Sequence, residues 1–195
     1  MKPAAFAYLA PRSLADALSM LDQVQDDGKV LAGGQSLVPA MNFRLARPAT
    51  LVDLNGVSEL DYLEGDSDGG VAIGALTRHA TFHKPPFDGP LAELLAKVVR
   101  NIAHYPIRQR GTFGGSLSHA DPASEWCLVA ATLGATMHLA SVSGTRTVPA
   151  TEFFRGTFTT ALMPNEILVR IDLPPLPVGW RTGFYEFSRR KGDFA

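Results

Sequence analysis

The sequence is poor in residues that would cross-link it or carry it into a membrane. Its 195 residues include one cysteine, Cys127. A single thiol excludes an internal disulfide, and any iron–sulfur cluster or thiolate zinc site built by this chain alone. No stretch reaches the roughly 18 apolar residues of a membrane span, and the N-terminal MKPAAFAYLAPRS lacks a signal-peptide core. These absences favour a cytoplasmic protein without a membrane span.

An excess of charge of one sign is also missing. Lys and Arg together number 18 and Asp and Glu 19, which gives a formal net charge of -1. Nucleic acids and anionic membranes recruit strongly basic surfaces, so neither is expected as a partner. Hydrophobic residues make up 46% of the chain, which is typical of a globular domain rather than a disordered one.

The first fifty-odd residues alternate between helix and strand signals. Ser13 has the features of an N-cap, with an acidic residue three positions later, and the apolar spacing after it predicts a helix to about Val24. Residues 29–31 and 50–52 are short apolar runs typical of buried strands, and residues 39–43 predict a short helix between them. This alternation predicts a small parallel α/β layer.

The remainder of the chain has a different character. Apolar runs on either side of a Gly- and Asp-rich segment predict an antiparallel hairpin over residues 62–73, and uninterrupted helical spacing predicts a helix over residues 91–102. Further strands are expected at residues 135–140, 146–148 and 167–173. The proline-rich residues 174–179 indicate a boundary or linker, and the segment that follows begins like a strand.

Two glycine segments stand out, LAGGQSL at Leu31–Leu37 and GTFGGSL at Gly111–Leu117. Glycine turns expose consecutive backbone N–H groups, which form a concave anion site because no Cβ blocks the ligand. The side chains of Gln35 and Ser36 would add donors in the first segment. Two such turns facing each other could clamp a pyrophosphate. The alternative, ordinary turn geometry without a ligand, stays open for each segment taken alone.

Known chemical motifs do not match the chain. Neither G-x-G-x-x-G nor G-x-x-x-x-G-K-[ST] occurs, so neither a Rossmann site nor a P-loop is indicated. His79 and His83 lack the glutamate of a zinc protease and are expected at the surface or near a helix cap, while Ser116 lacks the flanking glycine of a hydrolase nucleophile. Arg108 and Arg110 either meet phosphate or solvate a loop. No catalytic residue and no metal site is assigned.

The segments AGGQSLVPAMNFRLARPATLVDLN and IRQRGTFGGSLSHADPASE, at this separation, resemble the FAD-binding medium subunit of the molybdenum hydroxylases, the family of carbon monoxide dehydrogenase and xanthine dehydrogenase. The resemblance implies an α+β, two-lobed FAD-binding fold of the vanillyl-alcohol oxidase type, with a small parallel α/β lobe and a larger mixed or antiparallel lobe. The lobes are expected at residues 1–56 and 57–174. Residues 175–195 would be a linker and the start of a C-terminal domain that is truncated here.

The resemblance also implies which residues contact FAD. The first pyrophosphate loop is matched by Ala32, Gly33, Gly34, Gln35, Ser36 and Leu37, and the second by Gly111, Thr112, Gly114, Gly115 and Ser116. Glu125 matches an acidic residue that holds ribityl or ribose hydroxyls, with Asp121 as the alternative. Ile102 would pack against the flavin where some relatives place an aromatic residue. Leu168 matches a backbone contact to the ring system, and Tyr185 lies near a position beside the flavin.

The function implied by the resemblance is electron transfer. FAD bound by this chain would accept electrons from a [2Fe-2S] small subunit after substrate hydroxylation at a molybdopterin large subunit, and would pass them to an external acceptor such as NAD+, oxygen or a quinone. The implied assembly is a dimer of heterotrimers. Two alternatives stay open: a flavin-free scaffold that bridges partner subunits, and a stand-alone FAD-dependent oxidoreductase.

Overall fold

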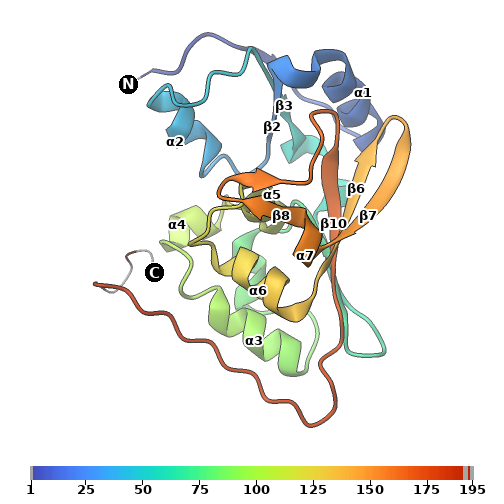
Figure 1. Ribbon diagram of the computed structural model, residues 1–195, viewed down its shortest axis with the longest axis vertical. Coiled ribbons are helices and arrows are strands. Elements are labelled where there is room, and N and C mark those ends of the chain that lie inside the picture. Colours follow the sequence, from blue (N-terminus) through green and yellow to red (C-terminus); the bar gives the residue numbers. More distant parts are fainter. Residues whose placement is uncertain (1, 191–192, 194–195) are drawn as a thin grey trace.

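The N-terminal residues form a three-stranded parallel sheet. The computed structural model of the chain describes residues 2–190 and 193, and its first sheet has the order β1-β3-β2. The strands are β1 (Ala7–Leu9), β2 (Gly28–Leu31) and β3 (Thr50–Asp53), which pair in parallel throughout. Two helices connect them, α1 (Leu14–Val24) and α2 (Leu37–Asn42). This is the predicted α/β layer, with β1 as an additional edge strand that the sequence reading did not include (Figure 1).

Helix α1 begins as its sequence predicts. The Ser13 hydroxyl accepts a hydrogen bond from the backbone N–H of Asp16 at 3.1 Å, so the N-cap satisfies one of the unpaired donors of the first turn. Ala17 and Leu21, four positions apart on one helical face, are buried. The amphipathic spacing of the sequence therefore fixes which face of α1 packs inward.

The second sheet is antiparallel and has five strands in the order β4-β5-β10-β6-β7. Its strands are β4 (Leu63–Gly65), β5 (Val71–Gly74), β6 (Thr136–Ser141), β7 (Gly144–Pro149) and β10 (Ile167–Leu173). A small separate hairpin joins β8 (Phe154–Gly156) to β9 (Thr159–Thr160). The predicted hairpin over residues 62–73 and the three later strands are confirmed.

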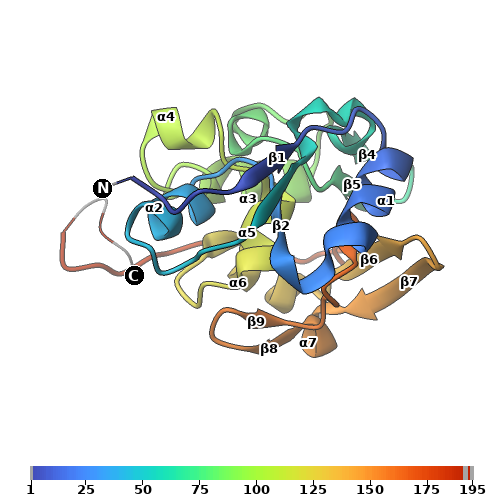
Figure 2. The ribbon, with the colours of Figure 1, turned by 90° about the horizontal axis from the view of Figure 1, so that it is seen from above.

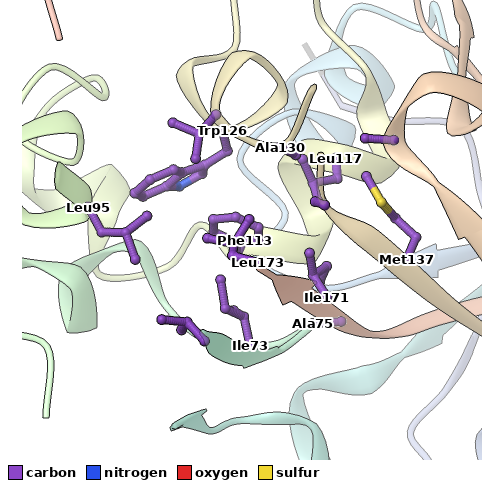
Figure 3. Packing of buried hydrophobic residues seen from close by; sticks show 14 of the residues in the cluster. Ile73, Ala75, Leu95, Phe113, Leu117, Trp126, Ala130, Met137, Ile171 and Leu173 are labelled. Atoms are coloured by element: carbon purple, nitrogen blue, oxygen red, sulfur yellow. The ribbon is translucent and has the colours of Figure 1, made fainter. Parts of the chain in front are cut away.

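Helices and single turns cover one face of the antiparallel sheet (Figures 1 and 2). The helices are α3 (Pro90–Val98), α4 (Tyr105–Arg108), α5 (Phe113–His119), α6 (Glu125–Leu133) and α7 (Ala150–Phe153), and the 3-10 turn η4 (His79–His83) contacts α3 and α4. Three other 3-10 turns belong to the N-terminal part, η1 (Gln25–Asp27) after α1, and η2 (Leu54–Gly56) and η3 (Ser58–Leu60) after β3. The main core lies between this layer and the sheet. Trp126 packs its indole against the rings of Phe82 and Phe113, with centroids 4.8 Å and 4.9 Å away (Figure 3).

A second, smaller core joins the two sheets. It contains Ala17 and Leu21 of α1 together with Leu76 and Ile167 from the second half of the chain. The register of β10 shifts between Leu168 and Arg170, which is a bulge. Ile167 and Leu168 face opposite sides, as neighbours in a strand do, so Ile167 faces the smaller core and Leu168 the main one. Because of the bulge, Ile171 faces the same core as Leu168 although three positions separate them.

Two predictions about elements were wrong in part. The helix predicted over residues 91–102 ends at Val98, where the Asn101 side chain donates to the carbonyls of Lys97 and Val98 at 3.2 Å and 3.4 Å and competes with further helical pairing. The strand expected after residue 179 is absent from residues 180–190, which run as an extended segment without a partner strand (Figure 1). No helix among the described residues is long and apolar enough to cross a membrane.

Candidate functional site

The two glycine segments, far apart in sequence, touch each other. A Cβ placed on Gly33 would lie 2.2 Å from the carbonyl oxygen of Arg110 and 2.7 Å from the Cα of Gly111, so only glycine fits this contact. A Cβ on Gly115 would lie 3.8 Å from the Cβ of Ala32. The structure therefore brings the residues of both segments to one place, at the junction between the parallel sheet and the helical layer.

The first segment is an open loop whose backbone donors are unpaired. It leaves β2 at Leu31 and enters α2 at Leu37, and Gly34 has a φ of 73°, the left-handed region that favours glycine. Within the described part of the chain, none of the backbone N–H groups of residues 33–36 donates a hydrogen bond. Gly33 is nevertheless buried. Buried N–H groups are almost always paired, so this loop has donors that a ligand or water must satisfy.

The Gln35 side chain also bonds within its own loop. The Gln35 amide donates to the carbonyl of Gly33 at 3.1 Å, two residues back in the same loop. This bond braces the turn, and because the amide nitrogen has a second N–H, the expected contact of Gln35 with phosphate stays a prediction. Ser36 is exposed and makes no capping hydrogen bond through its side chain.

The second segment is a helix start rather than a second glycine turn, so the predicted conformation was wrong, while the expected contact of its residues with FAD stays a prediction. Thr112 is the N-cap of α5, and its hydroxyl accepts from the N–H of Gly115 at 3.1 Å. The N–H of Phe113 donates to Thr77 at 2.9 Å, and that of Gly114 donates to Ala75 at 3.0 Å. The backbone N–H groups in the first turn of α5 are thus bound within the protein, and its glycines have no positive φ.

His79, expected at the surface or near a helix cap, is the first residue of η4 and is buried behind the second segment. It is 4% exposed, its Nδ1 accepts from the Trp126 indole at 3.0 Å, and its Nε2 lies 3.5 Å from the Ser116 hydroxyl. Burial, together with the cations of Arg78 and Arg108, lowers the pKa of His79 to about 4. The imidazole is therefore neutral at pH 7. No local pattern predicts this state, because burial of a histidine depends on tertiary packing.

Asn55 and Arg78 form a polar bridge that sequence reasoning missed. Asn55 Nδ2 donates to the carbonyl of Ala32 at 2.8 Å, and Asn55 Oδ1 accepts from Arg78 at 2.6 Å. Arg78 also donates to the carbonyl of Arg110. The bridge connects the backbones of the two glycine segments. Of Asn55, Arg78 and Arg110, only Arg110 was a candidate from the sequence, and it takes part through its backbone carbonyl.

Arg108 resolves one of the alternatives left by the sequence. Its guanidinium donates to the carbonyls of Ile102 and Ala103 at 2.6 Å and 2.7 Å, and to His83 at 3.1 Å. These bonds stabilise the chain reversal after α3, where Ala103 has a φ of 42°. Arg108 is therefore a structural residue of this turn, and His83 is partly buried beside it.

The acidic candidates lie next to the second segment. Helix α6 packs against α5, with Cys127 Sγ 3.5 Å from the carbonyl oxygen of Ser116. Asp121 holds the turn before α6 by accepting from the N–H of Ala123 at 2.9 Å. Burial raises the pKa of Glu125, to which the nearby carboxylates of Glu186 and Asp121 contribute.

The remaining candidates from the sequence, Ile102, Leu168 and Tyr185, do not lie together at the contact between the two glycine segments. Ile102 and Leu168 are buried in the main core, and Tyr185 is 86% exposed on the C-terminal segment. Two cavities, of about 270 Å³ and 250 Å³, lie elsewhere. They are lined by residues 65–70 and 87–91, and by residues of β5, β6 and β10 with the following prolines. The unpaired donors of the first segment line neither of them.

Comparison with known proteins gives consistent results. A model of the family described as "FAD binding domain in molybdopterin dehydrogenase" matches residues 4–176. The 6-hydroxypseudooxynicotine dehydrogenase complex subunit alpha of Paenarthrobacter nicotinovorans is 44% identical over 195 residues, which is 100% of this chain and 66% of the relative. The caffeine dehydrogenase subunit beta of Pseudomonas sp. (strain CBB1) is 41% identical over 100% of this chain and 66% of its own length.

Comparison with solved structures finds similar proteins. The chain superposes on quinoline 2-oxidoreductase from Pseudomonas putida 86 with a TM-score of 0.90 and 43% identity, over 100% of this chain and 67% of that one. For carbon monoxide dehydrogenase from Hydrogenophaga pseudoflava the TM-score is 0.92 and the identity 37%, over 100% and 68%. The chain thus spans 66% of the length of the first two relatives.

Proposed function

The chain belongs to the family of FAD binding domains of molybdopterin dehydrogenases, and from this premise we propose that it binds FAD with the diphosphate against residues 32–37. The observation that carries the proposal is the row of unpaired backbone N–H groups at Gly33–Ser36, in contact with the start of α5. Such donors suit phosphate oxygens, and no Cβ of Gly33 or Gly34 stands in the way. The residues present therefore fit the cofactor.

Residues of both lobes would share the binding. The loop of Gly33, Gly34 and Ser36 supplies donors from the N-terminal side, while Thr112 and Ser116 lie across from it on α5. Glu125, half-buried at the start of α6, is the acceptor proposed for the cofactor hydroxyls. Contacts of Ile102, Leu168 and Tyr185 with the ring system stay predictions, as does the choice between Glu125 and Asp121.

When bound, the isoalloxazine supplies a redox centre between an iron–sulfur partner and an external acceptor. The proposed protein is accordingly the medium subunit of a molybdenum hydroxylase, with [2Fe-2S] clusters and molybdopterin on partner subunits. The work of this chain is to bind and orient the cofactor, so none of its residues is assigned as a general base. The dimer of heterotrimers, the identity of the acceptor and the cytoplasmic location stay predictions.

The test is cofactor uptake followed by reconstitution. We expect the purified full chain, freed of flavin, to bind one FAD per chain, as measured by quenching of flavin fluorescence. Flavin reduction by substrate should then require the iron–sulfur and molybdenum subunits. Absence of FAD binding would favour the flavin-free scaffold, and substrate turnover by the chain alone would favour the stand-alone oxidoreductase; either result contradicts the proposal.

A further inference from the structure

A hydrogen-bonded bridge of side chains spans the two glycine segments. Asn55 Nδ2 donates to the Ala32 carbonyl at 2.8 Å, and Arg78 donates both to Asn55 Oδ1 at 2.6 Å and to the Arg110 carbonyl. Asp53 fixes Asn55 by accepting from its backbone N–H at 2.9 Å and from its side-chain amide. The bonds to Ala32 and Arg110 thus link the two glycine segments through the side chains of Asn55 and Arg78.

The bridge determines where the donors of the first segment point. A trans peptide group is planar, with its C=O and N–H directed to opposite sides. Because the Ala32 carbonyl is turned toward Asn55, the N–H of Gly33 in the same peptide group points away from the bridge. Gln35 acts in the same way on the next peptide group, since its bond to the Gly33 carbonyl turns the N–H of Gly34 in the opposite direction.

The bridge also sets the distance between the two lobes at this point. Asn55 follows the parallel sheet, whereas Arg78 and Arg110 belong to the second half of the chain. The Arg110 carbonyl held by Arg78 is the same atom that leaves no room for a Cβ at Gly33. The Arg78 fork therefore holds both walls of the contact at once, which a single lysine ammonium cannot do with the same planar geometry.

The bridge carries charges of both signs. Arg78 is half-buried, and burial lowers its pKa while the carboxylates of Asp61 and Asp53 oppose that effect. Arginine stays protonated in proteins, so these two carboxylates partly balance its cation. The bridge therefore acts through the geometry of its hydrogen bonds rather than through a net charge.

We propose that Asn55 and Arg78 are positioning residues for the cofactor diphosphate, acting as one unit that orients the Gly33 N–H and fixes the spacing of the two glycine segments. This inference rests on the proposed function and deepens it. It assigns a role in cofactor affinity to two side chains that need not touch the cofactor. Neither was a candidate from the sequence.

The experiment measures FAD affinity of the flavin-free full chain by fluorescence titration, with thermal unfolding of the same samples. The variants are Arg78→Ala, Arg78→Lys, Asn55→Ala and the double alanine variant. Arg155→Ala, an exposed arginine of β8, is the matched control. We expect the FAD dissociation constant to rise about tenfold or more in each single alanine variant. The double variant should bind FAD no more weakly than the weaker-binding of the two single variants, because each single substitution already removes the same bridge.

Chemical rescue separates positioning from general stabilisation. Millimolar guanidinium should restore much of the FAD affinity of Arg78→Ala, whereas methylammonium and the Arg78→Lys variant should not, since only a planar fork reaches both acceptors. Additive losses, lysine rescue, or unchanged affinity with a lowered melting temperature would overturn the inference. A wild-type chain that takes up no FAD would overturn the proposed function as well, so the two failures are distinguishable.

Discussion

Leu31–Leu37 and Gly111–Leu117 carry the same pair of adjacent glycines, yet their backbone donors are used in opposite ways. In the first segment the N–H groups of residues 33–36 have no partner among the described residues, and Gly34 takes a positive φ. In the second, the N–H groups of Phe113, Gly114 and Gly115 are bound to Thr77, Ala75 and Thr112. The first segment can accept a ligand with its backbone, while the second forms a wall.

The difference comes from what each pair of glycines follows. The first follows a strand of the parallel sheet, so its turn projects beyond the sheet edge. The second follows Thr112, whose hydroxyl caps a helix, and the helix packs directly on the antiparallel sheet. A repeated sequence pattern therefore does not imply a repeated backbone conformation when the preceding residues impose different geometry.

The largest expected effect is the pH dependence of stability that comes from His79, which lies behind the second segment. The unfolded chain takes up a proton at His79 near pH 6.5, whereas the folded chain takes it up near pH 4. Stability contributed by the neutral imidazole is present above pH 6.5 and is lost as the pH falls toward 4, by at most about 3 kcal/mol. Urea unfolding from pH 7 to 4 should show a shallower pH dependence in His79→Gln than in the wild type.

A direct titration of His79 in the wild type gives the same information even if the His79→Gln variant does not fold. The His79 ring signals of the wild type should show no protonation until well below pH 6 in an NMR titration. A titration near pH 6.5 would contradict the buried, neutral state and would place the second segment in a more open environment than the structure has.

The next effect concerns the contact between the segments. Gly33→Ala would bring a Cβ within 2.2 Å of the Arg110 carbonyl oxygen, and we expect it to push the loops apart at a cost of about 1–3 kcal/mol. If the loops bind FAD together, affinity falls about tenfold to hundredfold. Fluorescence titration gives the value, and Gly183→Ala, where no atom lies within 4 Å, is the control. Equal FAD affinity in Gly33→Ala and the wild type would break the comparison.

The smallest effect tests the second segment in the complementary way. A Cβ on Gly114 would lie 2.6 Å from the Ala75 Cβ and 2.7 Å from its carbonyl oxygen. Gly114→Ala should therefore lower the unfolding free energy of the flavin-free chain by about 1–2 kcal/mol, with a smaller change in FAD affinity than Gly33→Ala gives. Urea unfolding and FAD titration check the two quantities. A larger loss of affinity than of stability would contradict a mainly structural role for Gly114.

Much of the fold was predictable because its signals are local. The cap at Ser13, the apolar runs of β2, β3 and β10 and the hairpin β4–β5 depend on residues close in sequence, and each lies near its predicted place. β1 has only three residues, Ala7–Leu9, which is too short to show an alternating pattern, so it was not predicted. The end of α3 depends on the Asn101 side chain, which periodicity does not register.

The candidate site was predictable in its location but not in its construction. The two glycine segments meet as expected, because glycine allows the backbones to come close to each other. Asn55 and Arg78, which link the segments, and His79, which lies behind the second one, have ordinary surroundings in sequence. They acquire their partners only through tertiary packing. Polar residues that brace a loop from behind resemble surface residues until the fold is known.

The smaller core has a consequence for how the chain acquires its shape during synthesis. Ala17 of α1 and Ile167 of β10 belong to this core, although 150 positions separate their numbers. Most of its members are made early on the ribosome, but the core stays incomplete until β10 has been synthesised. Helix α1 therefore reaches its full packing only after the strands of the antiparallel sheet have been made.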